Sequence, residues 1–265
     1  MTAPNAEALG RARDLAAAAA RAPRELILAR FRSAGLAVET KPDGTPVTAA
    51  DRAAEGAIRQ RLRASGEFGT FEILGEEGGA EGATADYRWL IDPIDGTRGF
   101  ARGIPTFGTI VALEERGSGR ELVGAIHLPV TNETLTAARG LGAEQDGRRL
   151  RASAATDLRT AIIALPDVAE FREAGMEGAW AAVHAACDRV RGYTDCWAHA
   201  LVVAGAVDAM LEAALSPWDV RATQVLVVEA GGAYRARASR VAGRTDIVFG
   251  SPALVDRIAE LAGFE

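Results

Sequence analysis

The central stretch of the chain, residues 89–97, reads Trp89-Leu90-Ile91-Asp92-Pro93-Ile94-Asp95-Gly96-Thr97. Its three apolar residues predict a short buried strand, which ends where Pro93 and Gly96 force the chain to turn. Asp92 and Asp95 lie three residues apart across this turn, so their carboxylates can converge on one point. Two carboxylates so close repel each other unless a cation lies between them. Oxygen ligands suit Mg²⁺, Mn²⁺ or Ca²⁺, and the stretch therefore predicts a metal site at the end of a strand.

A polar Asp-Pro turn would be a simpler interpretation of the same residues. The Gly96-Thr97 dipeptide favours the metal site, because backbone N–H groups at such a turn can face an anion. A cation and a phosphate would then bind side by side.

The composition of the chain is that of a globular protein, with 265 residues of which 48% are hydrophobic. The net charge of −6 is scattered along the sequence, which predicts a small-molecule partner and argues against nucleic acid or a membrane surface. The sequence has no run of eighteen apolar residues and begins without signal-peptide features, so we expect a cytoplasmic protein. Cys187 and Cys196 form no Cys-x-x-Cys pair and predict ordinary reduced thiols.

Helical spacing of apolar residues predicts a helix from residue 6 to residue 31, in which Pro23 either causes a kink or begins a second helix. The polar loop 41–46 follows and contains Lys41, the single lysine of the chain. This lysine is either solvated or part of a site. Thr48 and Asp51 have the spacing of a helix N-cap and its capping partner, which alone would explain Asp51.

The next predicted strand, residues 71–74, ends in Gly75-Glu76-Glu77, where solvated acids are the simpler interpretation. Residues 98–105 are expected to form a mobile segment. Further strands at 107–113, 122–128 and 132–138, followed by a hairpin, would extend the same sheet. We therefore expect residues 1–150 to form an N-terminal α+β half.

Strands and helices alternate after residue 150, for example at 160–165 and 179–190, so residues 151–265 are expected to form a C-terminal α/β half. A helix is predicted at 196–207 and a short strand at 209–212, which ends in Glu212. Ser216-Pro217-Trp218-Asp219 is a strong helix start, and capping could account for Asp219. His127, His184 and His199 lack metal-ligand spacing and are interpreted as structural, although His199 is close enough to Asp195 to line a pocket.

Three separated motifs together resemble the signature of the inositol monophosphatase family. They are Gly75-Glu76-Glu77, residues 89–97, and Trp218-Asp219 with Glu229-Ala230-Gly231-Gly232. The match runs in order over nearly the whole chain. It implies a layered αβαβα sandwich, of the α/β (α+β) class, that hydrolyses a phosphate monoester with two or three Mg²⁺ ions, for which Mn²⁺ could substitute.

The resemblance also implies roles for individual residues. Glu76, Asp92 and the main-chain oxygen of Ile94 would hold one Mg²⁺, and Asp92, Asp95 and Asp219 would hold another. Gly96 and Thr97 would bind phosphate, while Thr97 and Asp51 would orient the attacking water and Glu76 would take part in catalysis. Lys41 corresponds to the lysine of the loop before the Thr48–Asp51 motif.

The substrate depends on other residues. The segment 97–109, the loop 41–48 and Asp195-Cys196 resemble the histidinol-phosphatase branch of the family more than the inositol branch. Histidinol phosphate carries an ammonium and an imidazole, so Asp195 and Glu212, together with Asp219, are expected to contact the substrate. Inositol hydroxyls could use the same acids, which leaves inositol-1-monophosphatase as the alternative. A metal-dependent binding or regulatory protein is the non-enzymatic alternative. Because some members of the family self-associate, we expect a homodimer.

Overall fold

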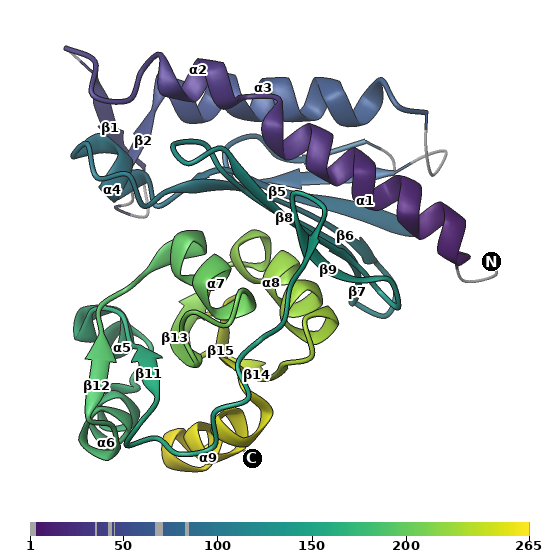
Figure 1. Cartoon of the computed structure of the whole chain (residues 1–265). Helices are drawn as coiled ribbons and strands as arrows, with labels where there is room; N and C mark the ends of the chain where they lie inside the picture. Colours follow the sequence, from purple (N-terminus) through teal and green to yellow (C-terminus); the bar gives the residue numbers. More distant parts are fainter. Residues whose placement is uncertain are drawn as a thin grey trace.

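The computed structural model describes residues 4–34, 36–41, 44, 46–66, 71–82 and 85–264. Two β-sheets alternate with three layers of helices (Figure 1). The upper sheet in this view has the order β10-β9-β8-β7-β6-β5-β3-β4, and the lower sheet has the order β12-β11-β13-β15-β14. The expected αβαβα sandwich is thus confirmed.

The outer helical layer of the N-terminal half consists of α1 (Ala6–Arg21), α2 (Arg24–Leu28) and α3 (Ala49–Arg63). Pro23 is the N-cap residue of α2, so it begins a second helix as one of the two alternatives predicted. Thr48 caps α3 and forms the predicted capping box with Asp51. The apolar face of α1 packs on β6, β7 and β8, and α3 packs on β5. This packing places the N-terminus of α3 beside the end of β5.

The eight-stranded sheet brings the first two sequence motifs to one edge. Its members are β3 (Glu72–Gly75), β4 (Gly79–Glu81), β5 (Tyr87–Asp95), β6 (Gly108–Glu115), β7 (Arg120–Leu128), β8 (Glu133–Ala138), β9 (Gly142–Gln145) and β10 (Arg148–Arg149). A separate hairpin pairs β1 (Val38–Thr40) with β2 (Pro46–Thr48). Pro42, Asp43 and Thr45 of the predicted loop lie outside the described residues.

One prediction around the central motif was wrong. The strand does not end before Asp92: β5 continues to Asp95, with a shift in its register against β6 between the two aspartates. Such an irregularity accommodates Pro93, which has no N–H group for the ladder. The segment 98–105 begins within the short helix α4 (Thr97–Ala101), and its mobility stays a prediction. Phe100 anchors this helix in a buried cluster with Phe107.

The C-terminal half is built on the mixed five-stranded sheet. Its strands are β11 (Ile162–Ala164), β12 (Arg189–Arg191), β13 (Ala209–Leu215), β14 (Ala233–Ala238) and β15 (Thr245–Gly250). Between the two sheets lie α7 (Asp195–Val203) and α8 (Pro217–Glu229), while α5 (Val168–Glu173), α6 (Glu177–Ala186) and α9 (Pro252–Ala262) cover the other face (Figure 1).

Several boundaries in this half differ from the predictions. The helix expected to reach residue 190 ends at Ala186, because the chain becomes extended at Cys187 and then pairs with β11 as β12. The helix expected at 196–207 ends at Val203, and the strand expected at 209–212 continues to Leu215. Pairing with β15 extends β13 beyond the predicted end, and local sequence does not specify such pairing.

The core joins the two halves. One buried cluster combines Leu90 and Ile110 of the first sheet with Met210 and Phe249 of the second, through side chains of α7 and α8. The division into residues 1–150 and 151–265 as separate halves stays a prediction. Within the described part of the chain, no helix is long and apolar enough to cross a membrane.

Candidate active site

Three carboxylates from two elements meet between the sheets. Asp92 and Asp95 lie at the end of β5, and Asp219 lies in the first turn of α8. One oxygen from each carboxylate can be chosen so that all three lie within 4.8 Å of one another. We call Asp92, Asp95 and Asp219 the acidic triad. The convergence predicted for the two aspartates of β5 is confirmed.

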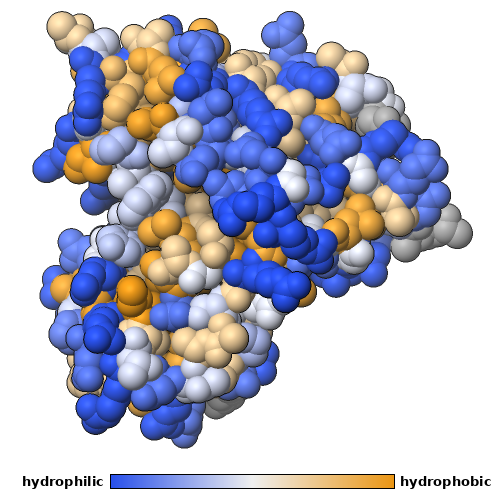
Figure 2. Space-filling model, in the orientation of Figure 1, coloured by the Kyte–Doolittle hydropathy of each residue, from blue (hydrophilic) through white to orange (hydrophobic). Residues whose placement is uncertain are grey.

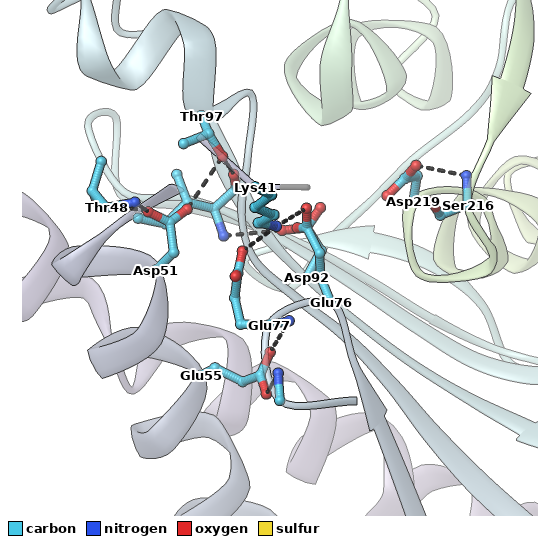
Figure 3. Close-up of polar contacts among 12 residues, drawn as sticks. Lys41, Thr48, Asp51, Glu55, Glu76, Glu77, Asp92, Thr97, Ser216 and Asp219 are labelled. Atoms are coloured by element: carbon cyan, nitrogen blue, oxygen red, sulfur yellow. Dashed lines mark hydrogen bonds and ion pairs between the residues drawn. The ribbon is translucent and has the colours of Figure 1, made fainter. Parts of the chain in front are cut away.

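Strand pairing places Glu76 next to the acidic triad. Because β3 runs parallel to β5 with Gly75 opposite Ile91, Glu76 leaves the sheet at the level of Asp92. The N–H of Glu76 donates to the carbonyl of Ile91 at 3.2 Å. Figure 3 shows the side chains of Glu76 and Asp92 close together.

The electrostatics of these acids fit a bound cation. Burial raises the pKa of Asp92 well above its usual value, and the charges of Glu76, Asp95 and Asp219 raise it further. Burial, followed by the charge of Glu76, raises the pKa of Asp219 to about 7. Buried carboxylates that repel one another are stabilised as anions by a cation between them. Their oxygens are ligands of the kind that Mg²⁺ and Mn²⁺ prefer.

Hydrogen bonds fix the turn after Asp92. The N–H of Ile94 donates to Asp92 Oδ1 at 3.0 Å, and Thr97 Oγ1 donates to the carbonyl of Ile94 at 2.8 Å. The carbonyl oxygen of Ile94 thus accepts from Thr97, and a carbonyl oxygen has a second lone pair for another partner. The structure is compatible with Ile94 as a main-chain ligand, which stays a prediction.

Asp51 connects α3 to the same turn. Its Oδ2 accepts from the N–H of Thr48 at 2.8 Å and from Thr48 Oγ1 at 2.6 Å. Its Oδ1 lies 3.2 Å from Thr97 Oγ1 (Figure 3). Capping and contact with Thr97 are thus performed by two oxygens of one carboxylate. Neither of the two interpretations of Asp51 excludes the other.

Gly96 has a conformation and surroundings that favour glycine. Its φ is +88°, in the left-handed region. A Cβ at this position would lie 3.1 Å from the carbonyl oxygen of Thr106 and 3.3 Å from Asp195 Oδ2. The N–H groups in the first turn of α4 follow directly, and first-turn N–H groups have no acceptor within a helix. The backbone at residues 96–97 therefore suits close approach by an anion.

Replacement of Gly96 by Ala should lower the free energy of unfolding by about 1–3 kcal/mol, because it adds steric crowding to the cost of a left-handed residue. Urea unfolding of the variant would measure this. Gly231→Ala is the matched control, since Gly231 has a φ of +85° and no atom within 4 Å of the added Cβ. Equal losses in the two variants would show that crowding around Gly96 has no effect.

Lys41 contacts the site and is not simply solvated. Its Nζ lies 2.7 Å from Glu76 Oε1 and 2.6 Å from Glu77 Oε1. Burial lowers the pKa of Lys41, but its bonds with the two glutamates raise it by more, so the net shift is upward. Burial raises the pKa of Glu77 to about 7, against the opposing effect of Lys41.

Asp195, the first residue of α7, approaches residues 96–97, which we call the phosphate turn. Its φ is +59°. Its Oδ2 lies beside Gly96, since it would be 3.3 Å from a Cβ added to that glycine. The next residue, Cys196, donates its N–H to Asp95 Oδ2, which links α7 to the acidic triad. Burial, followed by the charge of Glu212, raises the pKa of Asp195 to about 6. The structure therefore places Asp195 beside the predicted phosphate site.

Glu212 lies deeper than expected for a residue that contacts substrate directly. It is 3% exposed, and its Oε2 is 2.6 Å from His199 Nε2. The other nitrogen of His199 is 2.7 Å from Thr223 Oγ1. Glu212 and His199 thus form a buried pair behind Asp195, and the direct contact of Glu212 with substrate stays a prediction.

Sequence reasoning missed two glutamates near the site. Glu170 of α5 is exposed, yet the surrounding protein desolvates its carboxylate and the charges of Glu212 and Asp195 repel it, so its pKa rises to about 7. Glu55 of α3 is 3% exposed and bonds to the backbone after Glu76. Glu55 lies four residues after Asp51, on the same face of a helix, and this spacing was a signal in the sequence.

The comparisons with known proteins agree with this geometry. A model of the inositol monophosphatase family matches residues 11–262. The chain belongs to the inositol monophosphatase family. A histidinol-phosphatase from Mycobacterium tuberculosis is 38% identical over 226 residues, which cover 83% of this chain and 85% of the relative. The Nus factor SuhB of Escherichia coli is 37% identical, with coverage of 83% and 82%.

A solved structure supports the same relationship. The suhB protein from Bartonella henselae has a TM-score of 0.84 and 29% identity, and the alignment covers 96% of this chain and 99% of that one. As a member of this family the chain is a phosphatase, whose relatives act on small phosphorylated substrates. The family is generally metal-dependent, and the acidic triad is present here.

Proposed function

We propose that the protein hydrolyses L-histidinol phosphate to L-histidinol and phosphate with Mg²⁺, as a step of histidine biosynthesis. The observation that carries the proposal is the position of Asp195, whose carboxylate lies against Gly96 of the phosphate turn. A substrate whose phosphate binds at residues 96–97 would bring its alcohol portion to this acid. The ammonium of histidinol suits a carboxylate. A cation bound here would also favour the ionised form of Glu170, whose pKa is raised by burial and by the charges of Glu212 and Asp195.

The metal ligands proposed are Glu76, Asp92, Asp95, Asp219 and the carbonyl of Ile94. When bound, divalent cations would stabilise the charge of the phosphate and lower the pKa of a water molecule. The chain itself would supply orientation. Thr97 Oγ1 can donate its one hydrogen to the carbonyl of Ile94 or to Asp51 Oδ1, and in either case its lone pairs can accept a hydrogen bond from water.

Asp51 would support this arrangement. Its Oδ2 is held by two bonds from Thr48, which leaves Oδ1 facing Thr97 Oγ1. Oδ1 is therefore close enough to accept a proton from a water bound at Thr97. We propose Thr97 and Asp51 as the residues that orient the attacking water, with Glu76 beside them.

The proposal predicts a substrate preference. With Mg²⁺ present, phosphate release from L-histidinol phosphate should have a higher kcat/KM than release from inositol 1-phosphate. Replacement of Asp195 by Asn should raise KM for histidinol phosphate by about 10- to 100-fold, because a charge-assisted hydrogen bond to the ammonium is lost. The same change should affect the inositol ester less, since hydroxyl groups carry no charge.

Inositol-1-monophosphatase is the second candidate, because the acids beside the phosphate turn can also accept bonds from sugar hydroxyls. A clear preference for inositol 1-phosphate would exclude the histidinol assignment and leave the phosphatase class intact. Asp167→Asn is a suitable control for Asp195→Asn. Asp167 caps α5 with a bond to the N–H of Ala169 and is exposed.

Mg²⁺ as the physiological metal, Mn²⁺ as its substitute, a homodimer and a cytoplasmic location are further parts of this proposal. Light scattering of the purified protein would test the dimer. Activity with each metal after treatment with a chelator would test the choice of cation.

A further inference from the structure

Helix α3 carries a buried polar stripe that faces the site. Asp51, Glu55 and Arg59 are spaced by four residues and are 0%, 3% and 7% exposed. Residues with this spacing lie on one face of a helix. Asp51 contacts Thr97, as described above, but the hydrogen bonds of Glu55 within the described residues do not reach the acidic triad or the phosphate turn. Burial of a carboxylate needs compensating hydrogen bonds, so the partners of Glu55 indicate its role.

These partners are backbone groups of the turn that carries Glu76. The N–H of Glu77 donates to Glu55 Oε2 at 2.8 Å, and the N–H of Gly78 donates to Oε1 at 2.8 Å. We call residues 76–78 the Glu76 turn. Figure 3 shows Glu55 below this turn, with Glu77 and Glu76 above it. Both oxygens of one carboxylate thus hold consecutive N–H groups directly after Glu76.

Arg59 completes the arrangement from the other side. It donates through Nε to Glu55 Oε1 at 2.8 Å and through Nη2 to the carbonyl of Gly79 at 2.7 Å. The guanidinium therefore neutralises Glu55 and also holds the residue after the turn. Charge-assisted bonds of this kind are stronger than neutral ones.

The glycines around Glu76 leave the space that Glu55 occupies. A Cβ on Gly75 would lie 2.6 Å from Cδ and both carboxylate oxygens of Glu55. A Cβ on Gly78 would lie 2.6 Å from Glu55 Oε1 and 3.1 Å from Arg59 Nη2. The turn and the carboxylate are therefore in direct contact on both sides of Glu76.

We propose that Glu55 is a positioning residue that fixes the Glu76 turn from below, and so holds the Glu76 carboxylate in place to bind a divalent cation. Glu55 itself does not touch the cation. The inference rests on the proposed function, in which Glu76 is a metal ligand. It adds that α3 aligns two parts of the site, since Asp51 orders Thr97 and Glu55 orders Glu76.

The test compares Mg²⁺ affinity in Glu55→Gln and in the wild type, by titration calorimetry of the whole protein. Glutamine keeps the shape but has one oxygen and an NH₂ group, so it can no longer accept from both N–H groups of the turn. Loss of a partner that orients a metal ligand weakens metal binding by about 10- to 100-fold. We expect an increase of this size in the Kd for Mg²⁺. In phosphate release, the Mg²⁺ concentration for half-maximal rate should rise in parallel, while KM for the substrate at saturating Mg²⁺ stays the same.

Glu114→Gln is the matched control for a merely structural role. Glu114 is also a buried glutamate, 1% exposed, with arginine partners: Arg88 Nε lies 2.9 Å from Oε1 and Arg221 Nε lies 3.1 Å from Oε2. It pairs with Arg88 at the far end of β5 and β6, away from Asp92. This variant should lose stability in urea without a change in the Kd for Mg²⁺.

Gly78→Ala perturbs the same contact without removing Glu55, and it keeps the test valid if Glu55→Gln does not fold. Its Cβ would displace the carboxylate, so the Kd for Mg²⁺ should again rise. Gly56→Ala, on α3 with nothing within 4 Å of the added Cβ, should leave the Kd unchanged.

Unchanged Mg²⁺ affinity in both Glu55→Gln and Gly78→Ala, or equal weakening in Glu114→Gln, would overturn this inference alone. Absence of Mg²⁺ binding by the wild type would overturn the inference together with the proposed metal site.

Discussion

Replacement of Asp92 by Asn should lower Mg²⁺-dependent phosphate release by about 10³-fold, because cation binding contributes several kcal/mol of charge stabilisation and each 1.36 kcal/mol is a factor of ten in rate. Asparagine retains Oδ1, so the bond from the N–H of Ile94 can remain. The change therefore removes a charge and little else. Rates of phosphate release at saturating Mg²⁺ would measure the effect.

The same substitution should stabilise the protein when a chelator is present. Burial and the neighbouring acids raise the pKa of Asp92 in the folded state, so its negative charge disfavours folding above the unfolded pKa. At pH 8 without metal, Asp92→Asn should therefore have a higher Tm than the wild type. The difference should shrink toward acidic pH, as the wild-type carboxyl becomes protonated.

Asp208→Asn is the control for Asp92→Asn. Asp208 accepts from the N–H of Ile162 at 2.7 Å. It lies at the start of β13, whereas Ser216 and the helix that carries Asp219 follow the other end of that strand. This variant should retain phosphatase activity. If the wild type showed no Mg²⁺-dependent activity that Asp92→Asn abolishes, the catalytic proposal for this chain would fail and the alternative of a binding or regulatory protein would be favoured.

Replacement of Thr97 by Val should reduce kcat by about 10²- to 10⁴-fold, the range expected when a group that positions a proton transfer is lost. Valine has nearly the shape of threonine but cannot donate to the carbonyl of Ile94 or bond a water that faces Asp51. Because the acidic triad is untouched and only the bond to the carbonyl of Ile94 is lost among the proposed ligands, the Kd for Mg²⁺ should change by a smaller factor than kcat. Titration calorimetry and steady-state kinetics on one preparation would separate the two effects.

Thr136→Val provides the matched control for Thr97→Val. Thr136 is a buried threonine, 5% exposed, in β8, where it pairs with Ala125 and Glu144 away from the site. We expect normal kcat in this variant. A Thr97→Val protein with unchanged kcat would exclude Thr97 from the orientation of water.

Local sequence was sufficient for features that depend on near neighbours in the chain. The capping boxes at Thr48 and Ser216 were predictable because each involves a side chain three residues away. The end of the first helix near Pro23 follows from the missing N–H of proline. Prediction failed where strand pairing decided the structure: β13 is longer than predicted, and β12 occupies residues predicted to end a helix.

In the candidate site, too, features that depend on near neighbours in the chain were predictable, and contacts between distant segments were not. Its acids were identifiable because Asp92 and Asp95 share one turn, and because carboxylates at strand and helix ends suit a hard cation. The contacts of Lys41 with Glu76 and Glu77 could not be predicted, because 35 residues separate Lys41 from Glu76. The same limit applies to Glu170, which approaches Asp195 only through the packing of α5 on β13.

The sequence by itself determined the family, the reaction class and the set of acids, since these depend on residue types and spacings within short motifs. Only the tertiary structure decided which groups each acid contacts. It placed Asp195 against Gly96, paired Glu212 with His199 in the interior, and set Glu55 beneath the Glu76 turn. The physical reason is that these contacts arise from strand register and helix packing, which depend on the burial of apolar surface over the whole chain and on no single motif.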